Sequence, residues 1–331
     1  MTTTRIVRSP GFDPWYNLAL EEHLLRQVGN DEVILYLWQN QGTVVIGRNQ
    51  NAWKQCRCKK LDEDGKKLAR RLSGGGAVFH DLGNLNFTFI MNRKNYNLNR
   101  QLEVILQAVR HQGIEAEFSG RNDLVVEGRK FSGNAFYFEE TNAYHHGTIL
   151  VDVNFEDMSR YLQVSQEKMR SKAVDSVQAR VVNLRRLNPE LTIEKMAASV
   201  AAAFVDIYGG SGKIESITPE KLGLDELYRR YSSWEWRYGE TPKFDLVFST
   251  RFDWGEIQLG LSLRKAHIVQ AKIYSDAMNP QLIEAMAAGL TDSPLKPYSI
   301  ARCLEALPVT EDEQQILTQF KEWLLEKINS L

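Results

Sequence analysis

The stretch from Arg70 to Asn84, RRLSGGGAVFHDLGN, sets three successive glycines between two strand-like runs. Glycines cost backbone entropy and bury no side chain, so such a cluster suits a sharp bend or a ligand that lies against the backbone. Arg70 and Arg71 directly precede the loop, and two adjacent cations indicate that the ligand is anionic. A glycine cluster alone is also typical of a tight turn beside a solvated charge pair, so the rest of the chain must decide.

A second polar run lies further along the chain, from Gly120 to Ala135, GRNDLVVEGRKFSGNA. Polar and apolar residues alternate around the short turn Glu127-Gly128, which is typical of a hairpin that carries polar side chains into a cleft. Lys130 stands just past that turn. A lysine on a strand is usually a solvated surface residue. Together with the arginines and the glycine loop, however, it predicts a cationic, glycine-lined pocket.

Six blocks of sequence resemble the lipoate-protein ligases of the long, two-domain bacterial type. They are DPWYNLALEE (13–22), TVVIGR (43–48), the two runs quoted above, HHGT (145–148) and SWEW (233–236). The blocks are spread over most of residues 1 to 245, and RFDWG (251–255) resembles the start of that family's C-terminal domain. The resemblance implies an enzyme that uses ATP to activate lipoate as lipoyl-AMP, releases pyrophosphate, and transfers the lipoyl group to a lysine of a carrier domain.

The length of the chain, 331 residues, favours one large and one small domain, because single cores stop growing below this size. We expect a catalytic domain over residues 1–246 and an accessory domain over 250–331, with GETPK (239–243) as the linker. Strands adjacent in sequence favour an α+β fold over a doubly wound sheet. The large domain should have mixed, mainly antiparallel sheets with flanking helices, and the accessory domain a small α+β fold.

Local patterns place the elements. Asp13-Pro14 is typical of the N-cap and first residue of a helix, and Gly113 of the residue that ends one. Helices are predicted over 53–64, 99–111, 193–208, 281–288 and 311–331. Strands are predicted over 32–38, 43–47, 68–72, 77–80, 85–91, 257–263 and 268–274, and strands dominate 114–151. Residues 154–245 are predicted to be mainly helical.

Composition restricts the class of protein. A formal net charge of -1 argues against a nucleic-acid binder, since such proteins neutralise phosphates with excess basic residues. No apolar run has the length of a signal peptide or a membrane span, so we expect a cytoplasmic protein, as a monomer. The three cysteines, Cys56, Cys58 and Cys303, form no disulfide framework and lack zinc spacing. They are interpreted as structural or incidental.

The reaction that the resemblance implies sets two anions, a carboxylate and the α-phosphate of ATP, against each other. Fixed positive charge and aligned backbone N–H groups must offset their repulsion. Lys130 fits the role of bridging carboxylate and phosphate oxygens in both steps, as the family counterpart is held to do, and Arg71 fits a phosphate contact. The backbone of residues 76–79 (Gly76, Ala77, Val78, Phe79) fits a segment along the nucleotide. Two roles stay open for Asn122 and Asp123, namely holding the loop or reaching the nucleotide and its Mg²⁺.

The acyl arm of lipoate requires a narrow apolar slot. The resemblance places Trp38, Tyr144 and His146 along its far part, with Glu21 close by and Gly75 also in contact with lipoate. Trp38 is equally well explained as a core residue. The pair His145-His146 is not expected to share a metal, because adjacent residues on a strand point to opposite faces. The metal ligands stay undefined, and no tightly bound prosthetic group is expected.

The segment before the glycine loop is basic, with Lys54, Arg57, Lys59, Lys60, Lys66, Lys67, Arg70 and Arg71 against three acids, Asp62, Glu63 and Asp64. Two interpretations stay open, a solvated helix face and a surface that steers an acidic protein partner. The resemblance implies such partners, namely the acidic lipoyl domains of 2-oxoacid dehydrogenase E2 subunits and the glycine-cleavage H protein. The preferred acceptor, and the choice between lipoate and octanoate, cannot be read from the sequence.

Three other functions compete with an ATP-dependent ligase. Biotin ligases resemble the chain between Asn122 and Lys130, but their Gly-Arg-Gly-Arg loop is missing. A transferase that moves octanoyl or lipoyl groups between carriers without ATP needs a cysteine nucleophile, and no cysteine lies in the candidate loops. A non-catalytic lipoate-binding protein would not need Arg71 and Lys130 together.

Overall fold

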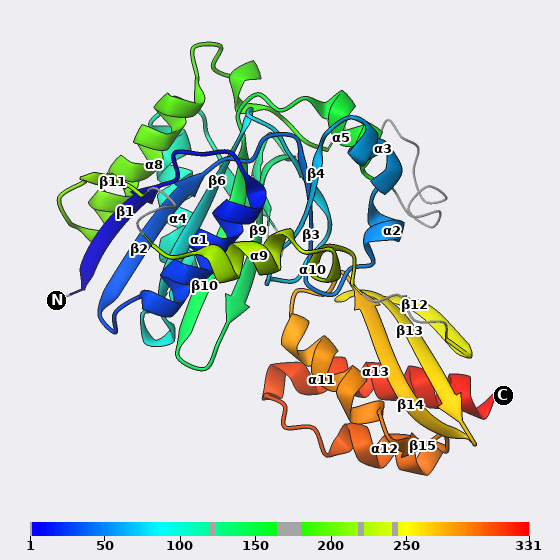
Figure 1. The fold of residues 1–331 in the computed structure, drawn as a ribbon. Helices are drawn as coiled ribbons and strands as arrows, with labels where there is room; N and C mark the ends of the chain where they lie inside the picture. Colours follow the sequence, from blue (N-terminus) through cyan, green and yellow to red (C-terminus); the bar gives the residue numbers. More distant parts are fainter. Residues whose placement is uncertain (1, 120–122, 164–179, 218–221, 240–243, 331) are drawn as a thin grey trace. The chain divides into compact units, whose positions relative to one another are not determined.

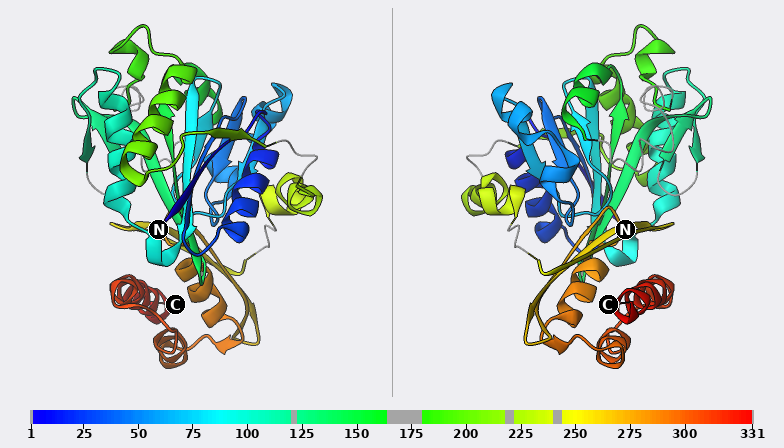
Figure 2. Two further views of the ribbon diagram at one scale, coloured as in Figure 1. Left: turned by 90° about the vertical axis from the view of Figure 1, so that its left-hand side faces the viewer. Right: turned by 90° about the vertical axis from the view of Figure 1, so that its right-hand side faces the viewer.

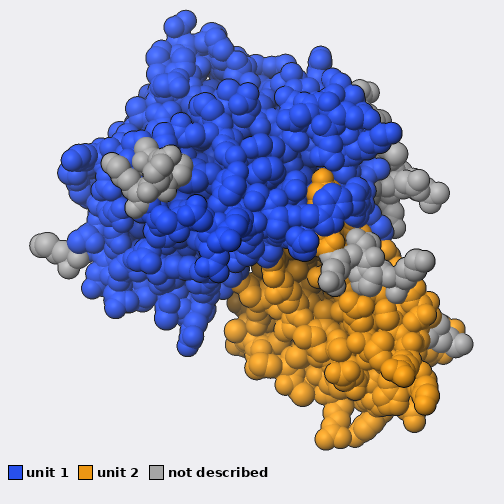
Figure 3. Space-filling model, in the orientation of Figure 1, with its two compact units in different colours: residues 1–46, 52–71, 77–237 blue, residues 47–51, 72–76, 238–331 orange. Residues whose placement is uncertain are grey.

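The computed structural model describes the chain except residues 1, 120–122, 164–179, 218–221, 240–243 and 331 (Figure 1). The chain divides into two compact units (Figure 3). The larger unit comprises Met1–Ile46, Ala52–Arg71 and Ala77–Arg237, and the smaller unit comprises Gly47–Asn51, Leu72–Gly76 and Tyr238–Leu331. The smaller unit therefore includes two short segments from the N-terminal part of the sequence, one of which is the glycine loop. The predicted linker at residues 239–243 falls largely outside the described residues.

An eight-stranded sheet forms the centre of the larger unit (Figure 1). β1 runs parallel to β2 and to β11, and the remaining neighbours are antiparallel. In spatial order the strands are β11 (Ile214–Ser216), β1 (Thr3–Arg8), β2 (Glu32–Trp38), β6 (Asn84–Asn92), β10 (Asn142–Leu150), β9 (Arg129–Phe138), β8 (Asp123–Val126) and β7 (Glu117–Ser119).

A second, three-stranded sheet brackets the glycine loop. β3 (Thr43–Ile46) lies in its centre, parallel to β4 (Lys67–Arg70) and antiparallel to β5 (Val78–His80). The chain leaves β4 through Arg71, forms the loop, and returns as β5. The strands predicted on both sides of the loop are confirmed.

Helices cover both faces of the large sheet (Figure 2). Helix α1 (Pro14–Gln27) begins as predicted, with Asp13 Oδ1 accepting from the Trp15 backbone N–H at 2.9 Å. On the opposite face lie α4 (Leu98–Arg110) and α8 (Ile193–Tyr208), whose apolar faces form one core with β2 and β6. Gly113 has a φ of 73° just after α4, which explains the glycine there.

The single helix predicted over 53–64 is wrong. The structure has two short helices, α2 (Ala52–Gln55) and α3 (Cys58–Glu63), because Cys56 leaves the helical path and forms an isolated bridge with Leu162. The remaining elements of this unit are α5 (Phe155–Tyr161), α9 (Asp225–Ser232), α10 (Trp234–Tyr238), and the 3-10 turns Arg93–Asn95 and Leu184–Arg186. β11 is a strand within the region predicted to be mainly helical.

The smaller unit packs helices on an antiparallel sheet. The sheet has the order β12 (Leu246–Phe252), β13 (Gly255–Arg264), β14 (His267–Ser275), β15 (Ser293–Pro294). The predicted alternation is confirmed, since Ile257, Leu259 and Leu261 point into one core. The helices are α11 (Pro280–Leu290), α12 (Pro297–Glu305) and α13 (Glu311–Asn329), the last begun by a capping box of Thr310 and Glu313.

Both units are α+β, with a mixed and mainly antiparallel large sheet, so the predicted fold class is confirmed. Within the described residues, no helix combines the length and the apolar character that crossing a membrane demands.

Candidate functional site

The three glycines of the loop have different physical surroundings. A Cβ on Gly74 would lie 2.2 Å from the carbonyl oxygen of Ala277, so packing alone excludes any side chain there. Gly75 has a φ of 88° and donates its backbone N–H to the same carbonyl at 3.1 Å. A Cβ on Gly76 would meet no atom within 4 Å. Only at Gly76, therefore, does the fold leave the absence of a side chain unexplained.

The two arginines before the loop have different surroundings. Arg70 donates from Nε to the carbonyl of Trp236 at 2.8 Å and from Nη2 to that of Arg237 at 2.9 Å, so it fastens α10 to β4. Arg71 is buried, and its Nη1 donates to the carbonyl of Val45 at 3.2 Å. Arg71 therefore places a positive charge inside the unit, near the carboxylate of Glu21.

Burial lowers the pKa of Arg71 to about 10, and the nearby Tyr144 and Glu21 oppose that shift. A group with this pKa stays protonated at neutral pH. The cation predicted to contact phosphate is therefore present and desolvated, which strengthens its attraction for an anion.

Four residues that the resemblance assigns to lipoate lie together in a buried cluster. Trp38 Nε1 donates to Thr88 Oγ1 at 3.0 Å, and Thr88 Oγ1 donates to Glu21 Oε1 at 2.7 Å. The same Glu21 oxygen lies 2.9 Å from His146 Nδ1. Tyr144 packs on His146 with their ring centroids 4.8 Å apart. The structure thus brings Trp38, Glu21, His146 and Tyr144 into one network.

Some buried polar atoms of this region make no hydrogen bond with any residue that the structure describes. They include the hydroxyl of Tyr144 and Nε2 of His80. Burial, and then Arg71 and His146, lower the pKa of His80 to about 3, so the ring is neutral. Its Nδ1 lies 3.1 Å from Asn40 Nδ2, a donor, which leaves the proton on Nε2. Burial raises the pKa of Tyr144, so its hydroxyl keeps its proton.

Arg71, His80 and Tyr144 therefore supply hydrogen-bond donors that are buried together with a positive charge. Nε2 of His80 and the Tyr144 hydroxyl have no partner among the described residues, and an unsatisfied buried donor costs about 1–3 kcal/mol. The groups that fit are acceptors carrying negative charge, such as a carboxylate or a phosphate.

Lys130 lies at the start of β9, as the predicted hairpin requires. The turn residues Glu127 and Gly128 both have positive φ, of 51° and 71°, which is typical of a tight hairpin. The backbone N–H of Lys130 donates to Arg180 at 2.7 Å, and its carbonyl accepts from Val182 at 2.9 Å. The strand around the lysine is thus held by residues 180–182 on one side, and it pairs with β8 on the other.

The side chain of Lys130 lies over Gly133. A Cβ at Gly133 would come within 2.8 Å of both Cε and Nζ of the lysine. The Gly133 N–H donates to Thr148 Oγ1 at 3.3 Å, and Thr148 shares a face of β10 with His146 and Tyr144. The ammonium therefore lies on the sheet face that carries the buried network.

Asp123 is the acidic neighbour of this lysine. Its Oδ1 forms an ion pair with Lys130 Nζ at 2.7 Å and has no hydrogen-bond partner within the described chain. Asn122, predicted beside it, lies outside the described residues. No group of three His, Cys, Asp or Glu side chains suited to a metal ion occurs among the residues that are described.

The segment predicted along the nucleotide ends in β5. Phe79 is buried and packs on Tyr161 with their ring centroids 5.5 Å apart, whereas Ala77 and Val78 are partly exposed. β5 is an edge strand of its sheet, so one row of its backbone groups is not used by the ladder. A backbone contact to a ligand is therefore available there.

His145 faces away from the site, as the strand geometry predicts. Its ring nitrogens lie 2.9 Å from Gln101 Oε1 and 2.8 Å from Asn134 Oδ1, and its ring packs against Phe87. Burial lowers its pKa to about 3. Shared metal binding with His146 is excluded by this arrangement.

His80 and Thr88 are not among the site residues predicted from the sequence. The sequence contains a pattern that could have indicated Thr88. Polar and apolar residues alternate along β6, and all of those concerned are buried: Asn84, Asn86 and Thr88 alternate with Leu85, Phe87 and Phe89. A buried strand that carries polar residues on one face marks a polar cavity or a site. His80 lies in the quoted loop stretch, but only the fold shows that its Nε2 lacks a partner.

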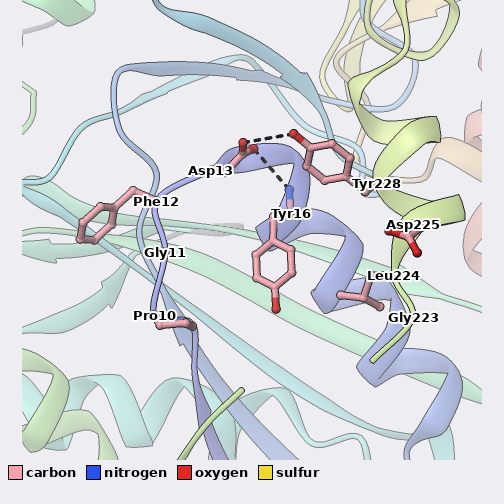
Figure 4. Close-up of a pocket in the computed structure, with 9 residues that line it drawn as sticks. All are labelled: Pro10, Gly11, Phe12, Asp13, Tyr16, Gly223, Leu224, Asp225 and Tyr228. Atoms are coloured by element: carbon pink, nitrogen blue, oxygen red, sulfur yellow. Dashed lines mark hydrogen bonds between the residues drawn. The ribbon is translucent and has the colours of Figure 1, made fainter. Parts of the chain in front are cut away.

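A pocket of about 570 Å³ lies elsewhere in the larger unit (Figure 4). Asp13, the N-cap of α1, forms part of it, and its Oδ2 accepts from the Tyr228 hydroxyl at 3.4 Å. The pocket contains none of the predicted site residues. It is lined by Pro10, Gly11, Phe12, Asp13, Tyr16, Gly223, Leu224, Asp225 and Tyr228.

Comparison with protein families gives matches over both parts of the chain. Residues 13–205 match the lipoyl protein ligase A/B catalytic domain. The chain belongs to this family. Residues 241–324 match the bacterial lipoate protein ligase C-terminus. The protein is therefore a lipoate-protein ligase by family, as the sequence blocks indicate.

Solved structures of lipoate ligases are similar to this ligase. LipL1 of P. falciparum, solved in complex with lipoate, is 30% identical with a TM-score of 0.86, and the match covers 98% of this chain and 99% of that one. A bi-partite ligase from Thermoplasma acidophilum, described with its E2 lipoyl domain, is 26% identical with a TM-score of 0.66, covering 74% and 100%. A lipoate-protein ligase A bound with ATP is 24% identical with a TM-score of 0.63, covering 72% and 98%, which shows a common fold.

Proposed function

We propose that this ligase activates lipoate with ATP, releases pyrophosphate, and transfers the lipoyl group from lipoyl-AMP to a lysine of a lipoyl carrier domain. The observation that carries the proposal is the set of buried, protonated donors formed by Arg71, His80 and Tyr144. Such a set suits a reaction in which a carboxylate and a phosphate meet. The lipoate in the LipL1 structure supports the substrate class.

In the first step, a lipoate carboxylate oxygen attacks the α-phosphorus, and the bond from that phosphorus to the bridging oxygen of pyrophosphate breaks. Lys130 is placed on a strand anchored on both sides, and Gly133 leaves its ammonium room to reach both reactants. A fixed cation stabilises the charge that develops on the oxygens without having to reorganise. Arg71 adds a second, desolvated cation.

In the second step, the acceptor amine attacks the acyl carbon, the carbon–nitrogen bond forms, and AMP leaves with the electron pair. The amine must lose one proton, and negative charge develops on the acyl oxygen. Lys130 fits stabilisation of this oxygen as well, so one residue serves both steps without a covalent intermediate. Site residues such as Gly76, Val78 and Phe79 fit the nucleotide through their backbone.

Mg²⁺ would accompany ATP and neutralise its phosphate charge. Asp123, whose carboxylate pairs with the Lys130 ammonium, fits one protein ligand. The described residues offer no complete protein cage for a metal, so phosphate oxygens and water would supply most of the coordination, which suits Mg²⁺.

The lipoate chain fits the region of Trp38, Tyr144, His146 and Glu21. Its apolar arm needs aromatic walls, and these side chains are closely packed around one another. The Glu21–His146 pair fixes the imidazole, so the ring forms a defined wall of the slot. Gly75 is assigned here by resemblance, and its positive φ already accounts for the glycine.

The proposed carrier substrates are E2 lipoyl domains and the H protein. The alternative, an ATP-independent transferase, requires a reactive thiolate. Cys56 and Cys58 are buried with their sulfur atoms 3.2 Å apart. The hydrogen bond between them, and then burial, raise the pKa of the Cys56 thiol, whereas the same hydrogen bond lowers the pKa of Cys58. Both sulfur atoms are buried, and neither cysteine lies in the candidate loops, which argues against a role as the nucleophile.

The test is ATP–pyrophosphate exchange with lipoate, octanoate or biotin offered separately. We expect exchange with lipoate, none with biotin, and loss of exchange when Mg²⁺ is chelated. Transfer of an octanoyl group between carrier proteins in the absence of ATP, without any exchange, would instead establish the transferase.

A further inference from the structure

Two tryptophans form an exposed pair on the larger unit. Trp53 of α2 and Trp234 of α10 are 46% and 53% exposed, and their ring centroids lie 6.0 Å apart at an angle of 55°. Large aromatic side chains side by side at a surface leave apolar area in water, and tryptophan is the residue type most enriched where binding energy concentrates. The pair joins segments far apart in the sequence, so the fold assembles it.

Both tryptophans stand on firmly held backbone. Trp236 Nε1 donates to the carbonyl of Arg70 at 2.9 Å, and Arg70 donates back to the carbonyls of Trp236 and Arg237. On the other side, Gln55 accepts from the Gln163 backbone N–H at 2.8 Å, which ties α2 to the end of α5. Little conformational entropy would therefore be lost when a partner covers the pair.

The surface is connected to the candidate site through α10 and β4. The residue that fastens α10 is Arg70, and the following residue is Arg71, the buried cation. A partner seated on Trp53 and Trp234 would therefore contact a helix that is bonded to the strand leading into the glycine loop.

Three basic residues follow Trp53 in the sequence, and one exposed acid, Glu235, follows Trp234. Lys54, Arg57 and Lys59 are exposed on α2, α3 and the residues between them. Lys54 and Arg57 make no ion pair within the described chain, and Arg57 instead donates to the carbonyls of Ser159 and Arg160. Lys59 is 92% exposed and lies 3.9 Å from Glu63, and such an exposed pair holds its lysine only weakly.

We propose that Trp53, Trp234, Lys54, Arg57 and Lys59 form the docking surface for the acceptor domain, and we call them the tryptophan surface. An acidic domain that presents a lysine fits it, because the tryptophans supply apolar contact and the basic residues steer acids toward it. This inference rests on the proposed function, since the acceptor is the substrate of the second step. It selects the steering interpretation of the basic segment over a merely solvated helix.

Paired variants test the surface in the full-length protein. One carries Trp53→Ala and Trp234→Ala, and another carries Lys54→Glu and Arg57→Glu. Matched controls are Tyr298→Ala, which removes an aromatic ring that is 76% exposed on the smaller unit, and Lys213→Glu, an exposed charge reversal elsewhere on the larger unit. Two rates are measured, namely lipoate-dependent pyrophosphate exchange and transfer from supplied lipoyl-AMP to an unlipoylated E2 lipoyl domain.

We expect KM for the lipoyl domain to rise about tenfold or more in both surface variants, consistent with loss of a hot spot. Exchange should stay within about twofold of the parent, because activation does not involve the acceptor. The charge variant should also lose the dependence of kcat/KM on salt concentration. Both controls should behave as the parent.

An unchanged KM for the lipoyl domain in a folded surface variant would overturn the inference. Equal losses in exchange and transfer would also overturn it, by showing a structural role. So would dimerisation of the parent in sedimentation that the tryptophan variant abolishes, since a second copy would then be the occupant. A parent without lipoate-dependent exchange would refute the proposed function itself, which keeps the two failures distinct.

Discussion

Lys130 is the residue on which the proposed chemistry depends most. Its side chain is partly exposed over Gly133, so its removal creates no buried cavity. We expect Lys130→Ala to lower lipoate-dependent pyrophosphate exchange by about 3 kcal/mol or more in transition-state stabilisation. The melting temperature should change little. Lys213→Ala serves as a matched control. Exchange at the parental rate in the Lys130 variant would show that Lys130 does not stabilise the transition state.

His80 gives a prediction about pH. Its pKa is about 3 in the folded chain and about 6.5 when unfolded, so the unfolded state binds the extra proton. Stability is therefore constant with respect to this group above about pH 6.5, and it falls as pH drops toward 3, by up to about 1.4 kcal/mol per pH unit. His80→Gln should make the difference in unfolding free energy between pH 7 and pH 5 smaller. An unaltered difference in denaturant titrations at the two pH values would contradict the buried, neutral state.

Substitution of Trp38 tests whether this residue lines the acyl slot. It is buried, stacked on Tyr36 and bonded to Thr88, so Trp38→Ala should cost about 3–5 kcal/mol of stability and leave a void. If the void belongs to the acyl slot, bulkier carboxylic acids should support pyrophosphate exchange while lipoate turnover falls. Trp38→Phe keeps most of the volume and serves as the control. A stable variant with the parental range of substrates would make Trp38 a core residue.

Substitutions in the glycine loop distinguish a glycine required by packing from one required by contact with a ligand. Gly74→Ala would clash with the Ala277 backbone, so we expect a lower melting temperature together with a loss of activity. Gly76→Ala meets no atom of the protein, so its melting temperature should stay at the parental value while KM for ATP rises. Calorimetry and exchange kinetics on both variants decide this. Parental kinetics for Gly76→Ala would mean that no ligand approaches the backbone there.

Elements defined by local rules could be predicted from the sequence. The N-cap at Asp13, the turn at Glu127-Gly128 and the alternation in β13 each depend on residues close in the chain, and all three are confirmed. The break between α2 and α3 could not be predicted, because it depends on a bridge from Cys56 to the distant Leu162. Tertiary pairing there overrides a sequence pattern that favours one helix.

The candidate site shows the same division. Motif resemblance points to Trp38, Glu21, Tyr144 and His146, which the fold brings together, but it gives no sign that Thr88 links Trp38 to Glu21. The unsatisfied Nε2 of His80 depends on burial by several strands and on Asn40 at its other nitrogen. Such facts arise only when distant segments meet, so no local pattern contains them. The roles assigned to these residues stay predictions.

Over the whole molecule, positive and negative charges nearly balance, but they are unevenly distributed. The formal net charge is -1, yet the exposed Lys54, Arg57 and Lys59 follow the exposed Trp53 closely in the sequence. Local charge of one sign can steer a partner when the total is near zero, because attraction at physiological salt acts over roughly 8 Å. A near-neutral protein is thereby able to select an acidic carrier without the broad affinity for nucleic acid that a basic protein has.

The smaller unit gives the last prediction, because it includes the glycine loop. Ala277 accepts the Gly75 N–H at 3.1 Å, Asn49 accepts the Ser275 N–H at 2.9 Å, and Asn49 Nδ2 donates to Pro280 at 2.9 Å. Removing residues 246–331 deletes every one of these partners and leaves the loop without its backbone support. We expect lipoate activation to fall strongly, whereas transfer from supplied lipoyl-AMP, which needs no ATP phosphates, should be largely kept.

The measurement is the ratio of the two half-reactions in the truncated protein, after circular dichroism has shown that the larger unit is folded. Gly74→Ala in the full-length chain provides a milder version, since it disturbs the same loop and leaves the smaller unit's own core in place. Both changes should lower activation more than transfer, because they act on the one segment that the first step is proposed to need. An equal loss of both half-reactions would mean that the smaller unit supports the whole fold rather than the loop.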